Sequence, residues 1–157
     1  MTMNEDTLTS IKWIRNYIRL AEEISMWSKD PRTKCGAIAV GKYGSIISQG
    51  YNGFPRGVKD YPERYTNREK KYKYVVHAEM NCIYNAALNG SSMNGADIYV
   101  YGLPVCNECA KGIIQIGVRK VFMKYPEHSE HVSEKWIEAF EDTKEMFEEA
   151  NVEYYTL

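Results

Sequence analysis

The sequence predicts a single α/β domain over residues 1–157. A chain of 157 residues with 44% apolar and 26% charged residues can bury one compact core. Short segments typical of strands alternate with segments of helical period, in the order α-β-β-α-β-α-β-α-β. No internal repeat, low-complexity tract or interdomain linker interrupts this order. Alternation of this kind indicates a sheet with helices packed on it.

The first predicted helix has Thr9 or Ser10 as its cap and runs to about Trp27. Asp30-Pro31 stops it, because proline disfavours helical backbone in the residue before it. Apolar side chains repeat every three or four residues along one face: Ile11, Ile14, Ile18, Ala21 and Ile24. This face is expected to cover the sheet.

A hairpin is predicted next, with strands over 36–40 and 45–51 around a glycine-containing turn. Segment 52–57 has two glycines and one proline in six residues, so it is expected to be a loop of unusual backbone shape. Segment 58–73 is polar and aromatic and has no clean period. It is therefore predicted to be a long connecting loop, and loops of that length are often functional.

The second half of the chain alternates more regularly. Asn89-Gly90 ends one predicted helix, Gly117 closes the next, and Ser133 caps the last. The inner face of that last helix is expected to carry Trp136, Phe140, Met146 and Phe147. The predicted elements are a helix over 77–88, a strand over 96–101, a helix over 106–116, a strand over 118–124, a helix over 133–150 and a strand over 152–155.

Composition disfavours several classes of protein. The net charge is -1, from 20 Lys+Arg against 21 Asp+Glu, whereas dedicated nucleic-acid binders carry a basic excess. No run approaches the ~18 apolar residues of a membrane span, and the polar N-terminus has no signal-peptide core. We expect a cytoplasmic protein without membrane contact. Its four cysteines are then expected to be core thiols, nucleophiles or metal ligands rather than disulfides.

Cys106 and Cys109 are the first half of a candidate metal site. Residues i and i+3 share one face of a helix, and the helix N-terminus favours thiolate over thiol. By itself the pair is equally compatible with a redox dithiol or two buried thiols. Zinc prefers thiolate sulfur and imidazole nitrogen in a tetrahedron.

His77 supplies the missing imidazole. Of the three histidines, only this one opens a predicted core helix, whereas His128 and His131 fall in a polar segment before the last helix. Three protein ligands leave one tetrahedral position for water, as catalytic zinc sites require. The conjunction predicts one catalytic zinc ion per chain, bound by His77, Cys106 and Cys109.

Glu79 lies two residues after His77, a step that turns the side chain through roughly 200° on a helix. In the looser first turn its carboxylate is expected to approach the water rather than the metal. There it can take up a proton and deliver it to a leaving group. The alternative is a glutamate that only stabilises the helix dipole.

These residues resemble the cytidine deaminase superfamily, whose zinc signature is H-x-E followed by P-C-x-x-C. His77-Ala78-Glu79 and Cys106-Asn107-Glu108-Cys109 match it. More narrowly, the chain resembles the deoxycytidylate (dCMP) deaminases over roughly residues 10–125. The further segments that carry this likeness are Ser28-Lys29-Asp30-Pro31, Gly50-Tyr51-Asn52-Gly53-Phe54-Pro55-Arg56-Gly57, Lys73-Tyr74-Val75-Val76, and Cys109-Ala110-Lys111 with Ile113-Ile114-Gln115.

The resemblance implies a three-layer α/β/α fold with a mixed five-stranded central sheet. It implies hydrolytic deamination of dCMP to dUMP, in which activated water attacks C4 and Glu79 moves protons. The backbone N–H of Ala78 would bind the ring carbonyl O2, and Asn52 would hold the sugar hydroxyl beside the close-approaching backbone of Gly53. It also implies a homo-oligomer, often a hexamer.

Other substrate contacts come from the residues themselves. A nucleotide phosphate needs a cation, and the candidates are Arg32, Lys34, Arg56 and Arg119. Tyr125 follows a strand expected to end near the site and is a candidate to line the pocket. A position in the core or at a subunit interface is an equal alternative.

The chain departs from the signature at Val105, which stands between Pro104 and Cys106. That residue shifts the carbonyls expected near the leaving amine. No Cys or His lies between Gly57 and His77, so a second, structural zinc is not expected.

The alternatives to dCMP deamination are a deaminase of another cytosine nucleotide, of a free purine or of a base in nucleic acid. A binding module with structural zinc is an alternative of a different class.

Overall fold

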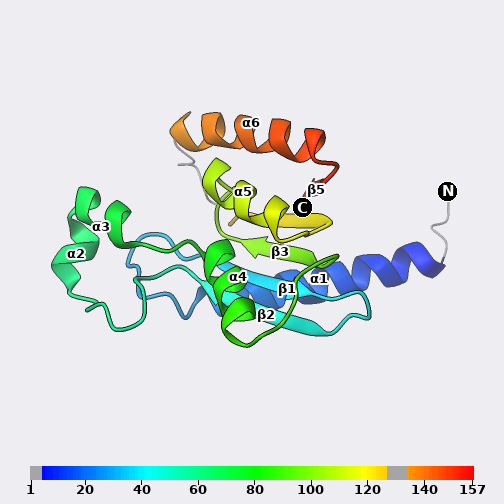
Figure 1. The fold of residues 1–157 in the computed structure, drawn as a ribbon, viewed down its shortest axis with the longest axis horizontal. Coiled ribbons are helices and arrows are strands. Elements are labelled where there is room, and N and C mark those ends of the chain that lie inside the picture. Colours follow the sequence, from blue (N-terminus) through cyan, green and yellow to red (C-terminus); the bar gives the residue numbers. More distant parts are fainter. Residues whose placement is uncertain (1–4, 127–133) are drawn as a thin grey trace.

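The computed structural model describes residues 5–126 and 134–157. It confirms the α/β class: a mixed five-stranded sheet lies between layers of helices (Figure 1). The elements in chain order are α1 (Glu5–Ser25), β1 (Gly36–Val40), β2 (Ile46–Tyr51), α2 (Pro62–Thr66), α3 (Arg68–Tyr74), α4 (Ala78–Leu88), β3 (Asp97–Tyr101), α5 (Asn107–Gln115), β4 (Lys120–Lys124), α6 (Glu134–Glu149) and β5 (Glu153–Thr156).

The strand order in the sheet is β2-β1-β3-β4-β5. β1 pairs antiparallel with both β2 and β3, and Gly36 is opposite Tyr51 on one side and Tyr101 on the other. β3–β4 and β4–β5 are parallel pairs. Parallel neighbours need a crossover, and α5 and α6 supply the two crossovers here.

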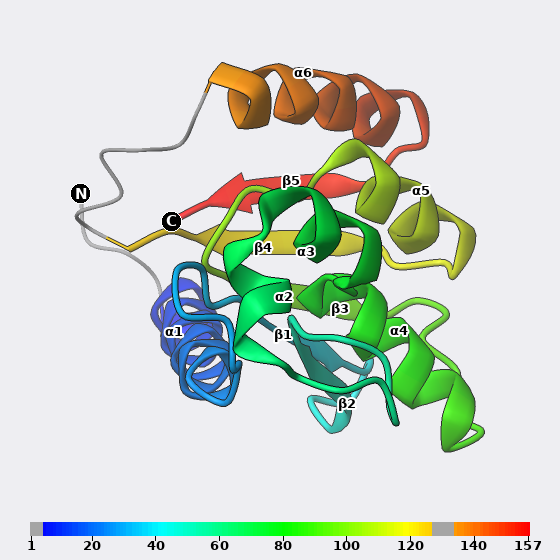
Figure 2. The ribbon, with the colours of Figure 1, turned by 90° about the vertical axis from the view of Figure 1, so that its left-hand side faces the viewer.

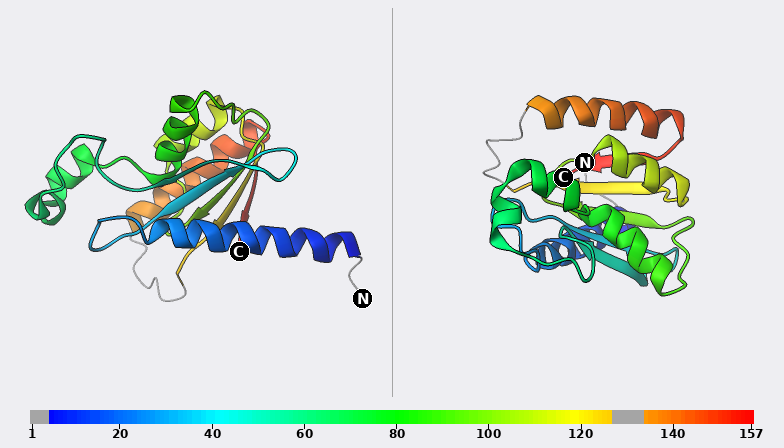
Figure 3. Two further views of the ribbon diagram at one scale, coloured as in Figure 1. Left: turned by 90° about the horizontal axis from the view of Figure 1, so that it is seen from below. Right: turned by 60° about the vertical axis from the view of Figure 1, so that its left-hand side comes forward.

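Helices cover both faces of the sheet (Figure 3). Alternate residues of a strand point to opposite faces, so Ile38 and Val40 pack toward α1 whereas Ala37 and Ala39 pack toward the opposite helices. α4 lies over the β1–β2 half of that second face, and α5 and α6 lie over the other half (Figure 2). β1 is therefore buried along its whole length.

Two glycines let helices approach the sheet closely. A Cβ at Gly50 would collide with the backbone of Ala78 and Cys82 on α4, and one at Gly36 would collide with the backbone of Ala21 on α1. Only hydrogen fits at these positions. The contact at Gly50 fixes the first turns of α4 against β2.

The prediction of a long connecting loop over 58–73 is wrong. Two short helices, α2 and α3, form there, and the stacked rings of Phe54 and Tyr65, 4.2 Å apart, hold them together with the edge of Tyr74 at 5.8 Å. The pair lies beside the main body of the fold (Figure 1). Short helices of this kind depend on tertiary contacts, which leave no periodic pattern in the sequence.

The helix ends differ slightly from the predicted ones. α1 begins at Glu5 rather than at Thr9 or Ser10, whereas Gly117 closes α5 with a φ of 84° as predicted. The predicted cap Ser133 lies outside the described residues, as do His128 and His131. Within residues 5–126 and 134–157, no helix is long and apolar enough to cross a membrane.

Candidate active site

The N-termini of α4 and α5 meet at one point. His77 is the residue before α4, and Cys106 is the residue before α5, with Cys109 in the first turn. The Nδ1 atom of His77 lies 3.4 Å from Sγ of Cys106 and 3.3 Å from Sγ of Cys109. All three ligand atoms lie within 4.8 Å of one another. The structure thus brings together the three residues that the sequence predicted as ligands.

This donor set fits zinc. Bond lengths of about 2.05 Å to nitrogen and about 2.3 Å to sulfur at a tetrahedral angle place the nitrogen about 3.6 Å from each sulfur. The two observed distances are close to that value. His77, Cys106 and Cys109 could therefore hold one zinc ion with little rearrangement and leave its fourth position free.

The surroundings of Cys106 favour its thiolate. Its Sγ accepts the backbone N–H of Cys109 at 3.4 Å, and this contact with the neighbouring Cys109 and His77 side chains lowers the pKa of Cys106. The neighbouring Cys106 and burial raise the pKa of Cys109. A zinc ion would be bound by both sulfurs as thiolates, so its binding would release whatever protons the two thiols still carry.

Glu79 lies beside these donors, and only 5% of its surface is exposed. Burial raises the pKa of its carboxyl above the ordinary value, although the charge of His77, its own backbone N–H and the Cys109 side chain oppose the shift. A buried carboxyl with a raised pKa can take up and release a proton, which suits proton transfer. Among the described residues, the cluster of possible ligands contains His77, Cys106 and Cys109 and leaves out the Glu79 side chain.

Similarity to a protein family identifies the kind of site that these residues form. Residues 11–125 match the family described as the cytidine and deoxycytidylate deaminase zinc-binding region. The chain belongs to this family. The deaminase is an enzyme that uses zinc for hydrolytic deamination, so the predicted cofactor and reaction class are confirmed, and the alternative of a structural-zinc module is wrong.

Individual relatives agree. The deaminase is 39% identical over 142 residues to an uncharacterized deaminase of Aliivibrio fischeri, covering 90% of this chain and 91% of that protein. It is 41% identical over 116 residues to human deoxycytidylate deaminase, covering 71% and 64% of the two chains. Its structure matches that of the cyanophage S-TIM5 dCMP deaminase in complex with dCMP and dUMP, with a TM-score of 0.71, 27% identity and coverage of 99% and 100%.

The departure at Val105 has a structural counterpart in α6. The Thr143 side chain is fully buried, and its hydroxyl lies 2.9 Å from the Val105 carbonyl oxygen and 3.2 Å from that of Ala139. The carbonyl directly before Cys106 therefore accepts a hydrogen bond from α6. The sequence gives no sign of this contact of Thr143, because an isolated threonine in an amphipathic helix does not reveal its partner.

Replacing Thr143 with Val is expected to lower the free energy of unfolding by about 1–3 kcal/mol, because the buried Val105 carbonyl loses its donor. Urea denaturation of the zinc-loaded deaminase measures the change. Thr143→Ser keeps the hydroxyl and is the matched control. Equal midpoints for wild type and Thr143→Val would show that this hydrogen bond contributes nothing.

Asn52 and Gly53 lie at the end of β2. The Asn52 side chain is buried; its Oδ1 accepts the N–H of Cys35 and its Nδ2 donates to the Thr33 carbonyl, both at 2.8 Å. One amide hydrogen and one lone pair remain for a ligand. Gly53 pairs through its backbone with Val76, directly before His77. Ala78 is the first residue of α4, so its N–H has no partner within the helix.

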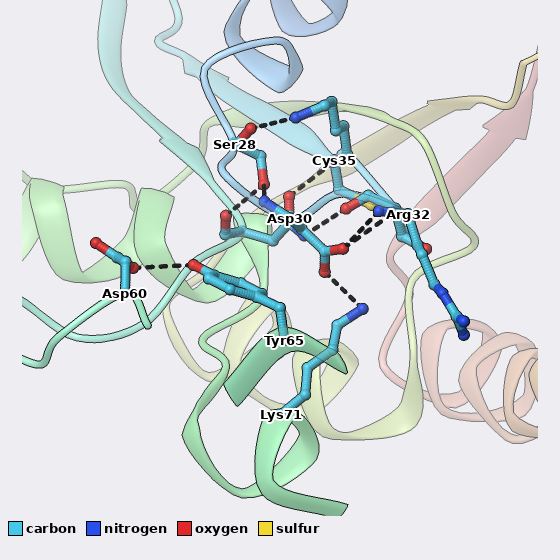
Figure 4. A network of polar contacts seen from close by, with 10 residues as sticks. Ser28, Asp30, Arg32, Cys35, Asp60, Tyr65 and Lys71 are labelled. Atoms are coloured by element: carbon cyan, nitrogen blue, oxygen red, sulfur yellow. Dashed lines mark hydrogen bonds and ion pairs between the residues drawn. The ribbon is translucent and has the colours of Figure 1, made fainter. Parts of the chain in front are cut away.

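The four candidate cations differ in position. Lys34 donates to the Ser28 carbonyl, and Arg56 donates to Asn85 on α4. Arg119 pairs with Asp97, the first residue of β3. The other end of β3, which leads to Cys106, is one strand length away, about 15 Å. The exposed guanidinium of Arg32 forms no hydrogen bond or ion pair with another described residue and points away from Lys71 (Figure 4).

Two aromatic residues lie on the α5–α6 side of the sheet. Tyr125 packs against the core, and burial raises the pKa of its hydroxyl. The ring of Trp136 lies 6.3 Å from the ring of His77. The sequence placed Trp136 on the inner face of its helix but gave no sign of this neighbour.

Cys35 and Cys82 are buried thiols, as predicted. Burial raises the pKa of Cys35 and raises that of Cys82 to about 12. Both therefore stay protonated at neutral pH and act as small apolar residues.

Proposed function

We propose that the deaminase converts dCMP to dUMP and ammonia, with His77, Cys106 and Cys109 as zinc ligands and Glu79 as general acid and base. The observation that carries the proposal is the buried carboxyl of Glu79 beside a three-membered nitrogen and sulfur cluster at two helix N-termini. A structural neighbour aligned over 99% of this chain was solved with dCMP and dUMP.

A bound zinc ion activates water at neutral pH, because it lowers the pKa of that water to about 7. Glu79 takes one proton from the attacking water and delivers it to N3 of the ring. The water oxygen bonds to C4, and the C4–N4 bond then breaks. Glu79 carries the second proton of the water to the departing amino group. The net reaction converts dCMP and water to dUMP and ammonia.

The remaining contacts hold the nucleotide. We assign the Ala78 N–H to O2 of the ring, since that donor is free at the start of α4. Asn52 and the Gly53 backbone bind the sugar hydroxyl through the remaining capacity of the amide. Arg32 is the preferred partner of the phosphate because its guanidinium is unpaired among the described residues, with Lys34 nearby on the same segment. Tyr125 lines the pocket.

A substrate panel tests this proposal. The zinc-loaded protein is expected to consume dCMP with a fall in the cytosine absorbance band, and to release one ammonia per dUMP. CMP, dCTP, 5-methyl-dCMP and deoxycytidine are compared under the same conditions. A protein that holds zinc but turns over guanine, a cytosine in RNA or none of these nucleotides would overturn the dCMP assignment.

We also propose that residues 1–157 form one domain and that the deaminase is a cytoplasmic homo-oligomer, with a hexamer as the form suggested by resemblance. All four cysteines are free, which fits a reducing compartment. Large aromatic side chains lie exposed at Trp13 and Trp27, 50% and 53% respectively, and such surfaces commonly bind partners. The net charge of -1 gives no support for a nucleic-acid partner.

A further inference from the structure

A buried ion pair lies outside the predicted zinc site. The side chain of Asp30 is 1% exposed, and one of its oxygens lies 2.6 Å from Nζ of Lys71, whose side chain is 13% exposed. The other oxygen accepts the N–H groups of Arg32 at 2.9 Å and Thr33 at 3.2 Å (Figure 4). Burying a carboxylate is costly unless it is paired and hydrogen-bonded, so these contacts hold Asp30 in one place.

Asp30 organises the segment between α1 and β1. Further along this segment, the Thr33 carbonyl and the Cys35 N–H form hydrogen bonds with the side-chain amide of Asn52. The hydroxyl of Ser28 donates a third hydrogen bond, to the backbone carbonyl of Asn52, at 2.8 Å. The position of Asn52 and of the Arg32 backbone thus depends on the fold of segment 28–35.

Lys71 belongs to a different part of the chain. It lies on α3, whose last residue, Tyr74, is three positions before His77. The segment that contains α2 and α3 starts and ends at one place, because Gly53 and Val76 form a backbone bridge there. The ion pair therefore joins the segment that carries the proposed nucleotide contacts to the segment that leads into the metal-site histidine.

We propose that the Asp30–Lys71 ion pair positions the nucleotide-binding segment 28–35 against the segment entering α4, so that Arg32 and Asn52 meet the phosphate and sugar of the substrate. Asp30 and Lys71 are positioning residues that act through Arg32 and Asn52. This inference rests on the proposed function. A shift of about 1 Å at such contacts is enough to reduce catalysis up to about 100-fold.

The test uses Lys71→Met and Asp30→Asn, which remove the ion pair from opposite sides. Each is expected to raise KM for dCMP about tenfold or more, with kcat within about twofold of wild type and unchanged zinc content. Lys71→Arg keeps a cation and is expected to restore most of the affinity. Lys73→Met is the matched control on the same helix, because the contact of Lys73 is an exposed pair with Glu69, and KM should stay at the wild-type value.

A second measurement separates positioning from simple stabilisation. In an Arg32→Ala background, Lys71→Met should raise KM much less than in wild type, because the residue it positions is gone. If Lys71→Met unfolds, Lys71→Gln is assayed below its melting temperature in the same two backgrounds. Full additivity with Arg32→Ala, or equal losses of kcat and zinc, would overturn the inference. A wild-type protein that holds zinc but ignores dCMP would instead contradict the proposed function.

Discussion

Glu79→Gln is expected to reduce kcat for dCMP by about 100- to 10,000-fold while one zinc ion per chain remains bound. The amide has nearly the shape of the carboxyl but cannot exchange protons. Because Glu79 is not one of the three clustered donors, its replacement should leave the metal site intact. Steady-state kinetics and elemental zinc analysis on the same preparation measure the two quantities.

The matched control is Glu108→Gln. Glu108 is also a first-turn glutamate of a helix at this site, but it is exposed and pairs with Lys111 at 2.7 Å. A glutamate that acts only on the helix dipole contributes less than about 1 kcal/mol at the surface, so Glu108→Gln should keep nearly full activity. Comparable kcat in wild type and Glu79→Gln would remove the carboxyl from the mechanism. Loss of zinc from Glu79→Gln would make it a metal-site residue instead.

The sequence predicted the strands and longer helices because each leaves a local pattern. The small apolar residues of β1, the apolar repeat of α1 and the glycine after α5 are all visible without knowledge of neighbours. α2 and α3 were not predictable in this way. Their five and seven residues are too few to show a period, and the stacking of Phe54 on Tyr65 that holds them is a tertiary contact.

Some residues of the candidate site were also predictable from local sequence, whereas others depend on tertiary contacts. The imidazole and two sulfurs were predictable because zinc chemistry restricts the residue types, and helix starts restrict their positions. Thr143 and the Asp30–Lys71 pair were not, since their importance depends on which segments pack together. A buried aspartate and a lysine separated by this length of chain look like surface charges until the fold is known.

Cys106→Ala is expected to abolish stable zinc binding and with it all measurable deamination. Two donors, His77 and Cys109, would remain of a cluster in which all three atoms lie within 4.8 Å of one another. The loss should also destabilise the fold, because the ion links the start of α4 to the start of α5, and the binding free energy of a metal adds to folding stability. Zinc content after dialysis, and the shift in melting temperature caused by added zinc, measure both effects.

Cys82→Ala is the matched control for this prediction. Cys82 is also a fully buried cysteine, on α4. Its backbone carbonyl accepts a hydrogen bond from the hydroxyl of Ser48 on β2, and it does not belong to the cluster of three donors. Its replacement leaves a small cavity and should lower stability while zinc content and kcat stay near wild type. Zinc-dependent stabilisation should therefore survive in Cys82→Ala and disappear in Cys106→Ala. Retention of one tightly held zinc ion by Cys106→Ala would place the metal elsewhere and separate the buried carboxyl of Glu79 from the chemistry assigned to it.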